Sequence, residues 1–304
     1  KNFEWKTIFN WSKNNSMVES LPEGIDKIQI GSGVYNVKAY AEVGKPYGAI
    51  YAKTFKRDAE GYILCQLDGS PKEGQDYEYL GCVQADWRGG WNNVFRLGNF
   101  SFSVMFDFQK GGKFFSQTSI QSSVDGQSVK SLEGRDADFF SRKILGESDE
   151  ERYGFMRPQN ANTPTANGQI YPDWGRPKGV VLPNCRYDED VEGLAGQQVL
   201  GYCTPERYWM HYTSRDISRF IYDASYVKLR EITVSYDLPK KWLRKTPFQT
   251  FRVAAVGRNI ATLFANTPHG LDPQATSTTG NAQGFERGFN LPSATYGFDI
   301  KVSF

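Results

Sequence analysis

The best candidates for contact with a ligand are aromatic residues in a long segment rich in Pro, Gly and Asn. Flat rings stack on sugar faces or on peptide side chains, and they are rigid, so binding costs them little conformational entropy. Packing of the rings within the segment or against a partner protein is favoured over ligand contact by about two to one, because large apolar residues in loops more often fold the loop. The candidate ligand-binding residues are Tyr171, Trp174, Tyr187, Tyr208, Trp209 and Tyr212.

Residue patterns for catalysis or metal binding are missing from the sequence. It contains no nucleophile elbow, no H-E-x-x-H motif and no phosphate-binding loop. The acidic pair Asp188 and Asp190 has the residue type that binds calcium, but a solvated acidic loop is the more common explanation. We therefore predict no metal site, no cofactor and no enzymatic activity.

The 4 cysteines form no C-x-x-C pair, and the 2 histidines are far apart, so a zinc site is not predicted. On an oxidising cell exterior, Cys185 with Cys203 and Cys65 with Cys82 are the candidate disulfides. The alternative of free thiols carries about equal weight.

Composition excludes several protein classes. The mean hydropathy is −0.55 with 39% hydrophobic residues, and the sequence has no run of about 18 apolar residues that would form a transmembrane helix. The net charge is +2 and no basic block stands out, so nucleic acid is not an expected partner. Aromatic residues reach 15%, which suits aromatic girdles or a sugar-binding surface.

The last ten residues predict the element that organises the chain. In residues 295–304, apolar or aromatic side chains occupy every second position back from Phe304, and polar residues or glycine lie between them. Apolar side chains toward lipid, polar ones toward the lumen and aromatics near the interfaces are typical of the closing strand of a bacterial outer-membrane barrel.

Other stretches alternate in the same way. Residues 100–109 do so most regularly, with aromatic and β-branched side chains on one face. In residues 226–236 the alternation changes face after Leu229, which predicts a bulge or a tucked-in loop base. Residues 110–223 have no sustained period and form a long predicted loop, with a candidate helix at residues 136–144. About eight strands are predicted, at residues 2–12, 35–43, 47–56, 91–97, 100–109, 226–236, 251–258 and 295–304.

The connections between these strands sort by length onto two sides. If the last strand runs down to the periplasm, the turns at Gly98-Asn99 and Gly44-Lys45 and the link 238–247 are periplasmic. The loops 13–34, 57–88, 110–223 and 266–292 then all lie outside, and this asymmetry is characteristic of outer-membrane barrels. The residues predicted to face the lumen are Lys38, Glu42, Arg96, Asp107, Glu231, Arg252, Arg258 and Lys301. Most are expected to hydrate the lumen or to contact a plug domain.

The amino-terminal residues indicate a larger protein. Phe3-Glu4-Trp5 already has strand character, and no initiator Met or signal segment comes before it. A small barrel would pair residues 2–12 with the closing strand. In a segment of a larger barrel, these two strands are expected to lie apart.

Several sequence motifs occur in a fixed order along the chain. The most specific is D-A-S-Y-V-K-L-R-E-I-T-V-S-Y-D-L-P at residues 223–239. F-R-V at 251–253, G-R-N at 257–259 and G-L-D-P at 270–273 follow it. Upstream lie G-K-P-Y-G-A-I-Y at 44–51 and D-W-R-G-G-W-N-N at 86–93, and residues 298–304 close the chain. In these motifs and in their order, the chain resembles the SusC/RagA family of TonB-linked transporters. The resemblance spans nearly the whole chain apart from residues 110–223.

The resemblance implies an all-β fold: a transmembrane antiparallel β-barrel of about 22 strands, of which residues 1–304 form the C-terminal segment, with long extracellular loops. It implies a plug domain and a TonB box that are absent from these residues. It also implies location in the bacterial outer membrane, a SusD-like surface lipoprotein that lids the barrel, and TonB-driven import of an oligosaccharide or a peptide.

A function of another class remains open at this point. A secreted all-β protein that binds carbohydrate or mediates adhesion would show similar alternation, with the apolar face of its strands buried in a sandwich core. An outer-membrane enzyme ranks last, because no motif supports it.

Overall fold

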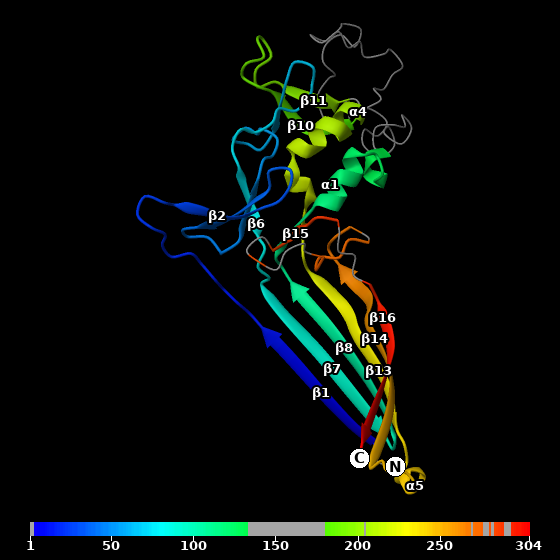
Figure 1. The fold of residues 1–304 in the computed structure, drawn as a ribbon. Coiled ribbons are helices and arrows are strands. Elements are labelled where there is room, and N and C mark those ends of the chain that lie inside the picture. The colour runs from blue at the N-terminus through cyan, green and yellow to red at the C-terminus, as the bar shows by residue number, and fades with distance from the viewer. Residues whose placement is uncertain are drawn as a thin grey trace.

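A computed structural model describes residues 3–132, 180–203, 205–268, 270–275, 280, 283–288 and 293–304. Its main element is a 6-stranded antiparallel sheet, hereafter the wall, with strand order β1-β7-β8-β13-β14-β16 (Figure 1). The wall strands are β1 (Phe3–Ser12), β7 (Trp87–Leu97), β8 (Phe100–Lys110), β13 (Tyr226–Asp237), β14 (Thr250–Ala265) and β16 (Thr295–Ser303).

The two faces of the wall differ in polarity, because side chains alternate along each strand and the strands are in register. One row of consecutive cross-strand partners on the apolar face is Trp5, Phe95, Phe102, Val234, Ala255 and Phe298. Large side chains on this face are exposed, with 57% exposure for Trp5 and 86% for Phe298. A face of this kind is stable against lipid and not against water.

The length of the wall strands fits a bilayer. Strands β7 and β8 have 11 residues each, which at about 3.4 Å per residue gives about 37 Å. A tilt of about 40° reduces this to about 28 Å along the membrane normal, close to the roughly 25 Å apolar band of outer-membrane barrels.

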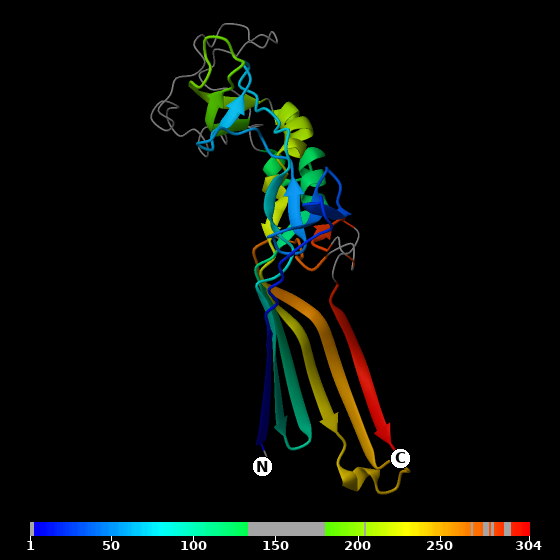
Figure 2. The same ribbon diagram turned by 90° about the vertical axis from the view of Figure 1, so that its left-hand side faces the viewer.

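The two ends of the wall carry connections of different length, as predicted from the sequence. Strands β7 and β8 are joined by the turn Gly98-Asn99, where Gly98 adopts φ +60°, and β13 and β14 by a link containing the short helix α5 (Lys240–Leu243). Both termini lie at this end, whereas the longer connections lie at the other end (Figures 1 and 2).

In the part of the chain that the structure describes, the prediction of about eight wall strands is corrected to six. Residues 35–43 and 47–56 form β3 (Lys38–Glu42) and β4 (Ala49–Ala52) of a separate 4-stranded sheet with β2 (Lys27–Ser32) and β6 (Glu78–Cys82). The turn at Gly44-Lys45 is therefore not periplasmic, and residues 13–86 form one long connection. Because two strands leave the wall, the up-and-down direction of the remaining strands is unchanged. The predicted sides of the other connections therefore need no change.

The described residues of the long connections pack into a loop layer at one end of the wall (Figure 2). Besides the β2–β6 sheet, this layer has one sheet of β5 (Ile63–Cys65), β10 (Val180–Tyr187) and β11 (Gln198–Cys203), and another of β9 (Lys113–Ser116), β12 (Ile221–Asp223) and β15 (Phe285–Glu286). Helix α1 (Gln117–Val124), the short helix α4 (Pro205–Arg207) and helical turns through Phe220 complete it. The helix predicted at residues 136–144 lies outside the described residues.

The outer edges of β1 and β16 lie apart, with β1 paired to β7 and β16 to β14 (Figure 2). This separation is the arrangement expected for a segment of a larger barrel, and it excludes closure by pairing of β1 with β16. None of the helices in the described part of the chain is long and apolar enough to cross a membrane.

Candidate lumen-facing site

The polar face of the wall is hollowed toward the end that carries the short connections. Glu4, Arg96 and Ser101 are successive cross-strand partners on this face. They line a hollow of about 380 Å³ together with Lys6, Val94, Ser103, Thr233, Ser235 and Arg252. Hydroxyl groups and charges of both signs make this surface suitable for water, a hydrophilic solute or the polar surface of a plug domain.

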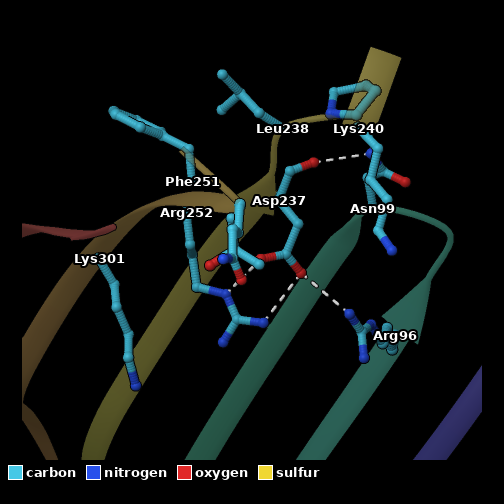
Figure 3. Close-up of a pocket in the computed structure, with 11 residues that line it drawn as sticks. Arg96, Asn99, Asp237, Leu238, Lys240, Phe251, Arg252 and Lys301 are labelled. Carbon is cyan, nitrogen blue, oxygen red and sulfur yellow. Dashed lines mark hydrogen bonds and ion pairs between the residues drawn. The ribbon is translucent and has the colours of Figure 1, made fainter. Parts of the chain in front are cut away.

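At the end of the wall that carries the short connections, Asp237 joins three strands (Figure 3). Arg252 donates to both of its carboxylate oxygens, at 2.6 and 2.9 Å, and Arg96 donates at 3.0 Å. Asn99 donates to the Asp237 backbone carbonyl at 2.8 Å, so the two hairpins are tied together. These residues line a second hollow of about 560 Å³. Lys301 lies beside it and does not reach the carboxylate (Figure 3).

At the opposite end, a buried ion pair fastens the β14–β16 connection to the wall. Lys228 of β13 donates to both carboxylate oxygens of Asp272 at 2.5 Å and to Gln274 at 2.8 Å. The two charged side chains are only 1% and 7% exposed. Two of the motifs that carry the family resemblance, at residues 223–239 and 270–273, therefore meet in this pair.

A β-bulge lies beside that pair, as the reversed alternation predicted. The register of β13 shifts between Leu229 and Glu231, so the extra residue Arg230 turns its guanidinium to Asp107 on the polar face. On β14, Asn259 adopts φ +52°, a left-handed conformation that Asn tolerates better than most residues, and accepts a hydrogen bond from Arg230. The G-R-N motif thus supplies the backbone geometry of the bulge.

The described candidate ligand-binding aromatics lie in a core of the loop layer. Tyr187, Tyr208, Trp209 and Tyr212 are only 4%, 0%, 2% and 3% exposed. They pack with β10 and β11, and the Tyr208 and Trp209 rings meet edge to face at 5.1 Å. The β5–β10–β11 sheet needs an apolar cover, and these rings supply it, so their burial favours the packing alternative. Tyr171 and Trp174 lie outside the described residues.

The acidic pair of the loop layer is neutralised by lysines. Asp188 accepts hydrogen bonds from Lys56 and Lys72 at 2.8 Å, and Lys72 also bonds Asp190 at 2.5 Å. Burial alone would raise the pKa of the Asp188 carboxyl, but the bonds from both lysines outweigh it and lower that pKa to about 2. Asp188, which directly follows β10, therefore ties this strand to Lys56 and Lys72 within the loop layer.

The cysteines are free, which corrects the two candidate disulfides. Cys65, Cys185 and Cys203 share one buried core, where burial raises the pKa of the Cys203 thiol to about 12. Cys82 lies in another sheet, with its thiol 3.3 Å from the Tyr47 carbonyl oxygen. A Cys65–Cys82 bridge is therefore not formed.

The structure separates the residues predicted to face the lumen into two groups. Lys38 and Glu42 belong to β3 in the loop layer: Lys38 lies 4.3 Å from the Tyr77 ring centroid, and Glu42 pairs with Lys45 at 3.2 Å. The predictions for Lys38 and Glu42 are therefore corrected. They failed because two-residue alternation does not distinguish a strand of the wall from a strand of the loop layer. The others lie on the polar face of the wall, namely Arg96, Asp107, Glu231, Arg252, Arg258 and Lys301.

Four charged residues of the wall ends were not among the residues predicted from the sequence. They are Asp237 at the end with the short connections, and Lys228, Arg230 and Asp272 at the opposite end. One signal was available, because Lys228 and Asp272 carry opposite charges within two recognised motifs. Nothing in the spacing of the others indicates their partners.

The chain was compared with protein families, curated proteins and solved structures. No family model matches the sequence. TonB-dependent receptor P3 of Formosa agariphila is 23% identical over 318 residues, which cover 97% of this chain and 26% of that protein. The RagAB peptide importer in its open-open state superposes with a TM-score of 0.51 at 15% identity, covering 100% of this chain and 27% of that one. Its closed-closed state gives 0.52 at 14% identity, with 100% and 28% covered.

The comparisons confirm the resemblance to SusC/RagA-type TonB-linked transporters, the fold of a C-terminal barrel segment and the outer-membrane location. The chain spans about a quarter of the length of the curated relative and of the solved structures it matches.

Proposed function

We propose that this chain forms the C-terminal part of the barrel wall, with its extracellular loops, of a TonB-dependent importer that carries a bulky nutrient across the outer membrane. The plug domain and the TonB box belong to residues outside positions 1–304. TonB pulls on that region to drive import, so the described residues contribute wall and loops.

The observation that carries this proposal is the single-layer wall. Its apolar face is exposed along six strands, its polar face is hollowed, and a folded loop layer lies over the end opposite the short turns. A secreted sandwich protein would bury the apolar face in its core. In the described part of the chain that face stays uncovered, as a lipid-facing wall requires.

The proposed solute is an oligosaccharide or a peptide, captured with a SusD-like lipoprotein that lids the loop layer. The polar face supports a hydrophilic cargo, because its hollow of about 380 Å³ is lined by serine, threonine and charged side chains. The solved structures of similar fold belong to a peptide importer, so peptides are the first cargo to test.

The test is uptake by cells that carry the intact gene or a deletion of it. Fluorescent oligopeptides and oligosaccharides of matched size are supplied separately, with and without a protonophore. We expect one cargo class to accumulate only when the gene and the proton-motive force are both present. Growth of the deletion strain on that class should fail and recover on complementation.

Two results would contradict the proposal. Recovery of the intact protein in the cytosol would exclude the barrel. Equal uptake of both cargo classes by the deletion strain and its parent, with the protein in the parent's outer membrane, would exclude import of these nutrients but not the barrel wall itself.

Purification of the protein through an affinity tag tests for a co-purifying lipoprotein.

A further inference from the structure

The link between β13 and β14 concentrates positive charge at one edge of the wall. Within residues 239–247, Lys240, Lys241, Arg244 and Lys245 are all exposed, and the Trp242 side chain is 61% exposed. No carboxylate in the described part of the chain forms an ion pair with these cations. The carboxylate nearest in sequence, Asp237, is already engaged by Arg96 and Arg252.

The link holds these groups on a fixed frame. Leu243 is 6% exposed and anchors α5 against the end of the wall. The backbone N–H of Trp242 donates to Pro239 at 2.9 Å, and both the N–H and the hydroxyl of Thr246 donate to the Leu243 carbonyl. The cations and the indole therefore project from a compact turn.

The position of the link relative to the membrane follows from the aromatic residues around it. On the apolar face, Tyr236 packs on Phe100 with ring centroids 4.6 Å apart, one residue before β13 ends. Just after the link, Phe248 packs on Phe251 at 5.9 Å and on Phe304 at 5.3 Å. Such aromatic girdles lie at the level of lipid headgroups, so the link begins where the apolar band ends.

We propose that this basic link binds the headgroups of anionic phospholipids, such as phosphatidylglycerol, on the membrane surface at this end of the barrel. Basic side chains near an anionic surface each strengthen attachment by about fivefold, and an exposed tryptophan is most stable at the membrane interface. An acidic protein would satisfy the charges, but it gives no reason for an exposed indole beside the lipid-facing girdle. The inference rests on the wall's orientation and not on the proposed cargo.

The test compares the intact protein with two charge-matched variants. One is K240Q/K241Q/R244Q/K245Q, and the control removes exposed lysines at the opposite end of the wall (K13Q/K27Q/K110Q/K130Q). Native mass spectrometry measures how much phosphatidylglycerol each retains when titrated in detergent, with phosphatidylcholine as the neutral lipid. A W242A variant tests the indole separately.

We expect the link variant to lose at least about tenfold in phosphatidylglycerol affinity, the control to change little, and phosphatidylcholine binding to stay equal in all proteins. A heat-dependent gel shift like that of the parent establishes that each barrel is folded. Unchanged phosphatidylglycerol binding by the link variant, or equal loss in the control, would overturn the proposal. So would capture of an acidic periplasmic protein by the link together with unchanged lipid binding.

Discussion

Replacement of Asp272 by Asn tests whether the buried ion pair holds the β14–β16 connection on the wall. The substitution keeps the shape of the side chain and removes its negative charge. Lys228, which is 1% exposed, then loses the carboxylate that balances its charge. The amide oxygen of Asn can still accept one hydrogen bond, so the variant isolates the loss of charge.

The expected magnitude follows from burial. Exposed ion pairs contribute about 0–1 kcal/mol, but removal of one partner from a buried pair costs about 3–5 kcal/mol. Each 1.4 kcal/mol corresponds to a factor of ten. The fraction of molecules in which residues 270–275 are undocked should therefore rise by about 100-fold to about 4,000-fold.

Hydrogen exchange of backbone amides measures this fraction. The N–H groups of Gln274 and Ala275 donate to the side chain and to the carbonyl of Asp272, at 2.8 and 3.0 Å, and both should lose protection in D272N. Amides in the middle of β8 serve as the internal control and should keep theirs. The double variant K228M/D272L should recover most of the protection at Ala275, whose acceptor is a backbone carbonyl, because an apolar pair of similar size removes the unpaired charge.

Two outcomes would refute this reasoning. Unchanged exchange at Gln274 in D272N would show that the pair does not hold the connection. Equal loss at Ala275 in D272N and in the double variant would show that the effect comes from altered packing and not from an uncompensated charge on Lys228.

Three further predictions test the loop layer and the wall. The pKa of the Asp188 carboxyl is lowered to about 2, so its ionised form should stabilise the loop layer by about 2 kcal/mol above pH 4. This stabilisation should be lost as the pH falls toward 2. Near-ultraviolet circular dichroism of the parent and of D188N measures the difference. Val104 lies on the apolar face at mid-strand and Ser103 on the polar face, so V104R should cost about 2–4 kcal/mol in urea titrations of folding into vesicles and S103R much less. A Cβ at Gly89 would collide with the phenyl ring opposite, whereas one at Gly90 has its nearest neighbour at 3.7 Å; G89A should therefore lower stability by about 1–3 kcal/mol and G90A should be tolerated better in the same titration.

The wall was predictable because its pattern repeats a simple physical requirement. Residues 100–109 alternate aromatic and polar side chains over a full strand, and the change of face after Leu229 located the bulge. Residues 35–43 alternate as well, but Val37 and Ala39 are 0% exposed in a protein core. Alternation reports that one face is apolar and does not report whether lipid or protein covers it.

The polar clusters were less predictable because their partners are distant in sequence. Lys228 and Asp272 are 44 positions apart, and Lys56 bonds Asp188 across 132 positions. No local period connects such pairs, since they depend on how the long connections fold back on the wall. The aromatic residues near Tyr208 posed a similar problem, because a ring that binds a ligand and a ring that packs a loop have the same composition signal.

In a barrel wall of this kind, the apolar face contacts lipid and the polar face contacts water. Spin labels placed one at a time at residues 100–109 of the intact protein in bilayers measure which face each position occupies. We expect a strict two-residue period: collisions with dissolved oxygen peak at Phe100, Phe102, Val104, Phe106 and Phe108, and collisions with a water-soluble nickel complex peak at the positions between them. Low accessibility to both reagents at the even positions, or nickel access at those positions, would contradict it.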